Sequence, residues 1–130
     1  YTTLFRSGNL MLSGSYLGSI LPANLAQNTL KFTHGGSMYG ITTGQVFGAN
    51  TTLSFPTQVN EKSYAVPAPD CLLPTAGAYS TFVYTPGNYG AGIAYKGTDF
   101  RTFVLGFPFE SIDNAQHRSR IMKAALDLFK

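Results

Sequence analysis

The C-terminal stretch 100–129, FRTFVLGFPFESIDNAQHRSRIMKAALDLF, constrains the fold more than any other part of the chain. The run 103–105, FVL, is short, apolar and rich in β-branched or aromatic side chains, which is typical of a strand covered on both faces. A glycine and a proline end this strand. Glu110 then follows just beyond its carboxyl end, where open α/β sheets place their ligands. The stretch therefore predicts an α/β fold with a candidate carboxylate at a strand end.

A closing helix is predicted after this strand, with Asp113 or Asn114 as its N-cap. Apolar side chains recur at helical spacing along it, and basic side chains lie mostly on the other side. The apolar set is Ile121, Ala124, Ala125, Leu128 and Phe129. The chain carries a net charge of +3, and four of its nine basic residues belong to this helix. A solvated helix face explains them more simply than nucleic-acid binding does, so we expect no nucleic-acid partner.

The middle of the chain, residues 38–85, is β-rich and punctuated by glycine and proline. The strands predicted there cover residues 42–47, 51–55, 64–66 and 79–84. Asp70 and Cys71 lie among three prolines, which predicts a loop that cannot be helical. After it, residues 92–95 and 101–105 flank a Lys-Gly-Thr-Asp turn and predict an antiparallel hairpin.

Upstream, residues 9–15 predict a buried strand with a tight turn at Gly14. Residues 24–32 carry apolar side chains on one helical side and predict a short helix. The sequence His-Gly-Gly at 34–36 is expected to end that helix, which would leave His34 exposed.

The composition fits one domain of an exported protein. The 130 residues are within the size of a single domain. Charged residues make up only 12%, about half the usual ~25%, which favours secretion or a cell-surface or periplasmic location over the cytosol. Cys71 is the only cysteine, so no internal disulfide or thiolate metal cluster is expected. No apolar run approaches the ~20 residues of a membrane span.

The first seven residues, YTTLFRS, have the sequence that the end of a common sequencing adapter encodes. We therefore expect residues 1–7 to be a non-native leader on a metagenomic fragment, and residues 8–130 to form one truncated domain.

Three segments carry a family resemblance. They are NLMLSGSYLGSIL, YAVPAPDCLLPTAGAYSTFVY, and AGIAYKGTDFRTFVLGFPFESI with the R-x-x-x-M-x-x-x-L-x-x-F helix after it. Together they resemble a bacterial domain labelled xanthan lyase-like, which is similar to the class I glutamine amidotransferase, or flavodoxin-like, fold. The resemblance covers Gly8 to Phe129. It implies the C-terminal part of such a domain, with a β-rich insertion and a C-terminal helix.

The resemblance also bears on catalysis. Active class I amidotransferases carry a nucleophilic cysteine in a sharp turn after the equivalent strand, and a His-Pro-Glu motif after a later one. Here the first turn is Gly14-Ser15-Tyr16, without cysteine, and the later motif keeps Pro108 and Glu110 but lacks the histidine. The resemblance therefore implies a non-catalytic accessory or interaction module of a larger exported bacterial protein, and the family label suggests a link to polysaccharide processing. Its expected partners are other domains of the same chain and polysaccharide.

Ligand binding is predicted at Ser15, Tyr16, Asp70 and Glu110, and two other functions stay open. One is a hydrolase or lyase acting on a polysaccharide or amide, with Ser15 as nucleophile, His34 or His117 as base, and Glu110 or Asp70 as orienting group. The other is a carbohydrate-binding module that uses tyrosine rings. Its candidates are Tyr64, Tyr79, Tyr84, Tyr89 and Tyr95. Each site residue also has a structural interpretation: Ser15 and Asp70 as turn caps, Glu110 as a loop lock and Cys71 as a buried hydrophobe.

No cofactor or metal is expected from the sequence. The histidines and carboxylates lack zinc-site spacing, and neither glycine-rich phosphate-binding motif is present.

Overall fold

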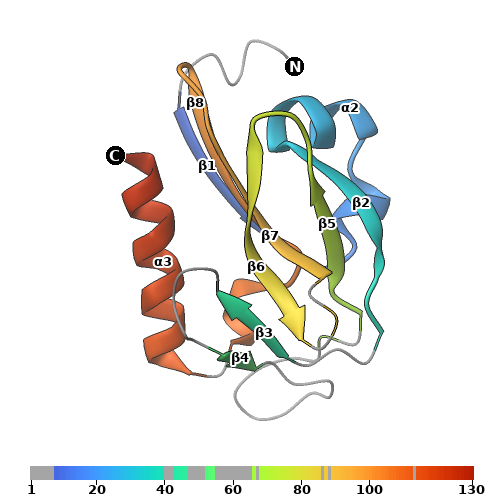
Figure 1. Ribbon diagram of the computed structural model, residues 1–130, viewed down its shortest axis with the longest axis vertical. Coiled ribbons are helices and arrows are strands. Elements are labelled where there is room, and N and C mark those ends of the chain that lie inside the picture. The colour runs from blue at the N-terminus through green and yellow to red at the C-terminus, as the bar shows by residue number, and fades with distance from the viewer. Residues whose placement is uncertain are drawn as a thin grey trace.

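The computed structural model describes residues 8–39, 43–46, 52–54, 66, 68–85, 87, 89–112 and 114–130. Three layers are visible in Figure 1. The C-terminal helix covers one face of a six-stranded sheet, and a two-stranded sheet with short helical segments covers the other. The prediction of a mixed α/β domain with a C-terminal helix is confirmed.

The larger sheet has the strand order β1-β8-β7-β6-β3-β4. Its strands are β1 (Gly8–Ser13), β3 (Thr43–Val46), β4 (Thr52–Ser54), β6 (Ala78–Thr85), β7 (Tyr89–Lys96) and β8 (Phe100–Leu105). β1 pairs with β8 in parallel, whereas the other pairs are antiparallel. The described sheet is therefore mixed, with one parallel pair at its β1 edge.

The predicted hairpin is confirmed, since β7 and β8 pair from Lys96↔Arg101 to Gly92↔Leu105. β1 alternates its side chains between the two faces of the sheet. Leu10 and Leu12 pack toward the short helical segments, and Met11 packs toward the C-terminal helix. The strand prediction for residues 9–15 is thus confirmed for 9–13, although these side chains are exposed or half-buried rather than fully buried.

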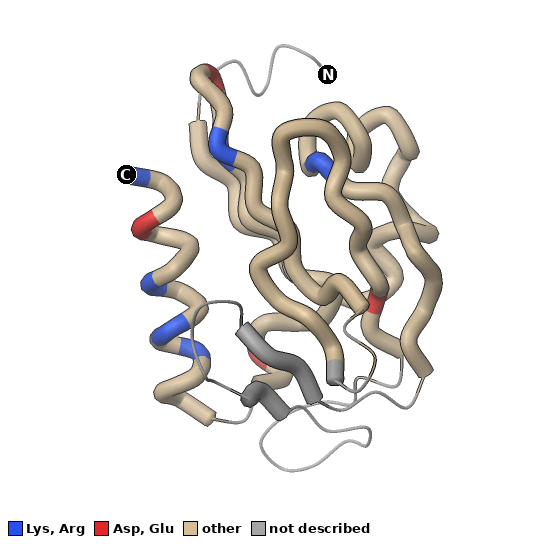
Figure 2. Tube along the Cα trace, viewed as in Figure 1, with Lys and Arg blue, Asp and Glu red and all other residues tan. Residues whose placement is uncertain are grey.

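The closing helix, α3 (Ala115–Phe129), begins where the sequence predicts. The Asn114 side chain caps it by accepting hydrogen bonds from the backbone N–H groups of Gln116 and His117. Ile121 and Ala125 are its buried residues, and they pack against the aromatic core of the sheet. Figure 2 shows basic residues spread along this helix, and Arg120, Lys123 and Lys130 are exposed, as predicted for a solvated face. No helix in the described part of the chain is long and apolar enough to span a membrane.

In the layer formed by the two-stranded sheet and the short helical segments, two predictions are wrong. The elements of this layer are α1 (Leu17–Ile20), α2 (Ala23–Leu25), the π-helical η1 (Ala26–Leu30), β2 (Phe32–Ser37) and β5 (Asp70–Pro74). The predicted helix ends at Lys31, which adopts a left-handed conformation with φ 66°, and the His-Gly-Gly sequence that was expected to end it lies inside β2. His34 is therefore a half-buried strand residue and not an exposed helix-end residue.

The proline-framed loop predicted around Asp70 is strand β5. It pairs antiparallel with β2, from Phe32↔Pro74 to Ser37↔Asp70, with an irregularity between His34 and Ser37. Because the prolines fall at or outside the ends of this strand, they remove little of its hydrogen-bond ladder. Cys71 is buried, as predicted.

Several other predictions fall wholly or partly outside the described residues. These are the leader 1–7, most of the strand predicted at 64–66, the turn residues Pro86 and Asn88, and the alternative cap Asp113. β3, β4 and β6 confirm the remaining strands predicted in the β-rich region. A 3-10 helix, η2 (Phe109–Ser111), links β8 toward α3 and carries Glu110.

Candidate functional site

The candidate site lies where the parallel strands β1 and β8 end together. The Gly14 N–H donates to the Leu105 carbonyl at 3.3 Å, which keeps the two chain segments adjacent past the end of β1. The Asp70 N–H donates to the Gly106 carbonyl at 2.7 Å, so the first residue of β5 joins the same end. Carboxyl ends of parallel strands are where α/β sheets place functional groups.

A strand–turn–helix elbow forms one wall of this site. Tyr16, between β1 and α1, has φ 63° and ψ 14°, a left-handed conformation that is uncommon for a residue with a large side chain. Its carbonyl accepts hydrogen bonds from the backbone N–H groups of Ser19 and Ile20 and from the Ser19 hydroxyl. Gly14 and Gly18 flank it at the spacing of a G-x-S-x-G nucleophile elbow, and Tyr16 occupies the nucleophile's position. Its side chain is 40% exposed.

Asp70 connects β5 to this elbow. The residue is 0% exposed, and its Oδ2 accepts a hydrogen bond of 3.2 Å from the Gly18 N–H. The first N–H groups of a helix have no partner within the helix, so a carboxylate placed there stabilises the turn. The local turn cap predicted for Asp70 is therefore wrong: the carboxylate caps a backbone N–H group that lies 52 residues away.

His34 lies against the same turn. A Cβ atom added to Gly18 would lie 2.2 Å from the His34 Cγ, so only glycine leaves room for the imidazole. His34 Nε2 is 3.7 Å from Asp70 Oδ1, which is beyond hydrogen-bond length. Both atoms are buried and have no hydrogen-bond partner within the described residues. The space between the imidazole and the carboxylate is thus too narrow to hold a water molecule.

The surroundings of Asp70 are desolvated. The buried Tyr84 hydroxyl donates to the Asp70 carbonyl at 2.8 Å. Burial, followed by the charge of Asp70, raises the pKa of Tyr84 well above its ordinary value. Burial also raises the pKa of the Cys71 thiol, opposed in part by a backbone hydrogen bond from Gly90. Neither group is therefore activated as a nucleophile.

The structure brings some of the predicted site residues together and separates others. Ser15 lies beside Tyr16 in the elbow, but within the described chain its hydroxyl makes no hydrogen bond to either histidine. Glu110 is exposed on η2, which is tied to β1 because the Ser13 Oγ accepts the Phe109 N–H at 3.2 Å. His117 lies in the first turn of α3 and belongs to a different layer from His34. Asp70 and His34 are the pair that the fold brings together.

The tyrosines predicted as sugar platforms have different environments. Tyr84 is part of the core, and Tyr95 is half-buried against Phe100 with the Lys31 ammonium 4.7 Å from its ring centroid. Tyr79 and Tyr89 are exposed, and Tyr64 lies outside the described residues.

The sequence interpretation missed Gly18 and Tyr84, which hold the site in place. The Gly14-x-Tyr16-x-Gly18 spacing was a readable signal for the elbow. It was not used because tyrosine, and not serine, stands at the central position. No local signal marks Tyr84, since its partner is a backbone carbonyl on a neighbouring strand. Groups of three or more histidine, cysteine or acidic residues that could hold a metal ion do not occur in the part of the chain that is described.

Comparison with protein-family models gives no match, and no curated protein matches the chain.

Proposed function

We propose that this chain is a non-catalytic accessory or interaction module of a larger exported bacterial protein linked to polysaccharide processing. Its scaffold would be the C-terminal part of an amidotransferase-like domain with a β-rich insertion. The observation that carries the proposal is Tyr16 at the elbow, in the left-handed conformation and in the place of a nucleophile. A tyrosine there keeps the strand–turn–helix geometry but not the reactive group.

The neighbouring hydroxyl groups support the same proposal. Ser13 Oγ already accepts the Phe109 N–H, which holds η2 in place. Ser15 makes no hydrogen bond to an imidazole in the described chain. Nucleophilic catalysis by serine needs a base within hydrogen-bond reach, and the base in turn needs an orienting group. Here the possible base and orienting group, His34 and Asp70, adjoin each other but are not linked to a nucleophile.

A second function, a hydrolase or lyase centred on His34, is favoured by one observation. The Nε2 and Oδ1 atoms that face each other at 3.7 Å are both buried and unpartnered. A shift of under 1 Å would create a charge-assisted hydrogen bond, and catalytic hydrogen bonds are often long before substrate binds. In this alternative Asp70 orients His34, and Ser15 or the Tyr16 hydroxyl meets the substrate.

Labelling with a serine-reactive fluorophosphonate, together with hydrolysis of chromogenic esters, separates the two functions. The accessory module should show no labelling above the heat-denatured protein, and His34→Gln should leave that background unchanged. Stoichiometric labelling that Ser15→Ala abolishes and Ser13→Ala retains would favour the enzyme. Polysaccharide cleavage that raises ultraviolet absorbance, and that depends on His34 or Tyr16, would overturn the accessory function in favour of a lyase.

A further inference from the structure

β1 lies at an edge of the six-stranded sheet, since among the described strands only β8 pairs with it. The Gly8 N–H donates to the Asp99 carbonyl, and the Gly14 N–H donates to the Leu105 carbonyl, each at 3.3 Å. The backbone groups of a parallel strand alternate between its two sides, so the even-numbered residues of β1 bond to β8. Its odd-numbered residues therefore direct their N–H and C=O groups away from the sheet. These residues are Asn9, Met11 and Ser13.

This edge lacks the features that usually keep edge strands from pairing. Natural edge strands are very short or bulged, or they carry charged residues or proline. β1 is six residues long, pairs with β8 without a register shift, and contains neither a charged residue nor a proline. The opposite edge of the described sheet, β4, is only three residues long. Within the described part of the chain, β1 thus presents an open row of backbone donors and acceptors, which another extended strand would match.

The surface beside this edge is uncharged and partly apolar. Residues 8–30 contain no Lys, Arg, Asp or Glu, and Figure 2 shows this whole segment in tan. Ile20 is 73% exposed. The leucines between positions 10 and 25 pack on one core cluster but stay half-buried. They are Leu10, Leu12, Leu17, Leu21 and Leu25. A partner on this edge would therefore meet a neutral, partly apolar surface.

We propose that a second copy of this chain docks on this edge, with the two β1 strands antiparallel about a two-fold axis at Met11. In this register Met11 of one copy lies opposite Met11 of the other, and Asn9 lies opposite Ser13. These are hydrogen-bonded pairs, so every outward N–H and C=O group of one strand meets its complement on the other. Leu10 lies opposite Leu12 in the closer, non-hydrogen-bonded position, where apolar pairs stabilise a sheet.

Charge and symmetry favour a second copy over other contacts. A two-fold pairing brings the neutral segment 8–30 of one chain against the same segment of the other, so no charge is desolvated. Contact of this edge with the outer side of α3 would instead bury Lys123, Asp127 and Lys130, whose ion pairs are exposed. A two-fold interface must be self-complementary, and the alternation of β1 about Met11 meets this requirement. This interface does not depend on the function proposed for the elbow.

Association of the unmodified chain is the first test. Sedimentation equilibrium should show a monomer–dimer equilibrium that shifts to dimer as the protein concentration rises. Salt should not weaken the dimer, because no ion pair contributes to it.

Amide hydrogen exchange, followed by NMR, should show the alternation along β1. The N–H groups of Asn9, Met11 and Ser13 should exchange about ten-fold more slowly when about nine-tenths of the chain is dimeric, because exchange then occurs from the remaining monomer. The N–H groups of Leu10 and Leu12, which face β8, should be protected at low and high concentration alike.

Paired substitutions at the two-fold axis test the register. Met11→Lys and Met11→Glu each place like charges opposite each other and should weaken dimerisation at least about ten-fold. An equimolar mixture of the two variants should recover the dimer, because opposite charges then face each other. Leu126→Lys, which adds a charge at an exposed position of α3, is the control and should leave association unchanged. Circular dichroism of each variant measures whether the monomer is folded.

The proposal is overturned if the parent chain stays monomeric up to about 1 mM, which would leave the edge to a strand of a different chain. It is equally overturned if a dimer forms but Met11 and its odd-numbered neighbours exchange as in the monomer. Folded Met11 variants that associate as the parent does, or whose mixture stays monomeric, would also contradict it. If both variants unfold, the exchange pattern of the parent chain decides.

Discussion

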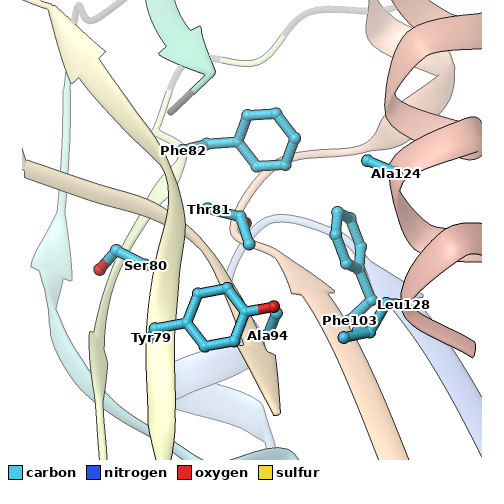
Figure 3. A pocket seen from close by; sticks show the side chains of 8 residues that line it. All are labelled: Tyr79, Ser80, Thr81, Phe82, Ala94, Phe103, Ala124 and Leu128. Atoms are coloured by element: carbon cyan, nitrogen blue, oxygen red, sulfur yellow. The ribbon is translucent and has the colours of Figure 1, made fainter. Parts of the chain in front are cut away.

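The two faces of the six-stranded sheet are covered in different ways. On the face covered by β2 and β5, the core is mostly aliphatic, with Leu30, Leu72, Ile93 and Val104 fully buried beside Phe32. On the face covered by α3, the buried aromatic residues are Phe82, Tyr84, Phe103 and Phe107, and a cavity lined by Thr81, Ala94 and Ala124 remains (Figure 3). On the strand-covered face, backbone atoms of β5 come into close contact with the sheet. On the helix-covered face, side chains fill the space between α3 and the sheet.

Glycines explain why the strand-covered face is so close. A Cβ atom at Gly90 would lie 2.1 Å from the Leu72 carbonyl oxygen, so β5 approaches the sheet almost to backbone contact. α3 cannot come as near, because a helix needs about 10 Å between its axis and the layer that it packs on. Large rings fill most of that distance, and the gap remains where Ala94 and Ala124 face each other.

Among the substitutions that test this difference between the two faces, Gly90→Ala should change stability the most. The new methyl group meets a backbone oxygen, which cannot rotate away, so β5 must move off the sheet. We expect a loss of about 3 kcal/mol in the free energy of unfolding, measured with urea. Gly14→Ala is the control, because the nearest atom there is a Leu17 side-chain carbon at 3.3 Å, and it should cost less than about 1 kcal/mol. Equal losses in the two variants would contradict the backbone-contact explanation.

A matched pair of small-to-large changes sharpens the comparison. Ala26→Leu adds volume to the filled aliphatic face, and we expect it to lose about 2 kcal/mol. Ala124→Leu adds the same volume beside the cavity, and we expect a gain of up to about 1 kcal/mol. Thermal and urea unfolding of both variants measures the difference. A gain in stability for Ala26→Leu together with a loss for Ala124→Leu would contradict the conclusion that the strand-covered face is the more tightly filled one.

The pH dependence of stability should show the smallest effect. The pKa of Tyr84 is raised in the folded state, so its contribution is complete below the unfolded value of about 10. Above that pH the unfolded chain loses the proton and the folded chain keeps it. Stability should therefore fall as pH rises, by up to about 1.4 kcal/mol per pH unit.

Tyr84→Phe should remove this part of the slope and lose about 1 kcal/mol at neutral pH, because the Asp70 carbonyl loses its donor. Absorbance at the phenolate band gives an independent measurement. The parent and the variant should release the same number of tyrosine protons before they unfold. One extra proton released by the folded parent would show that Tyr84 is accessible.

The parts of the fold set by local patterns were predictable from the sequence. The β8 run, the Lys-Gly-Thr-Asp hairpin and the Asn114 cap each depend on residues a few positions apart. β5 was predicted as a loop because of the prolines around it. Its pairing with β2 makes it a strand, and local sequence patterns cannot identify that partner. The same non-local pairing places His34 in a strand and brings it to Asp70.

The candidate site was only partly predictable for the same reason. Asp70 and Ser15 were named as caps or ligand residues, but the atom that Asp70 holds, the Gly18 N–H, lies 52 positions away. The left-handed conformation of Tyr16 cannot be read from a residue type that rarely adopts it.

The two ends of the described chain are joined by side-chain contacts. The Phe129 carbonyl accepts hydrogen bonds from Asn9, 120 positions earlier, and from Arg101. β1 likewise pairs in parallel with β8, near the other end of the sequence. Within the described residues, the strand that pairs with β1 is therefore made only after β2 to β7. Folding should therefore be slow and concerted, and removal of the last helical turn should weaken the attachment of the first strand.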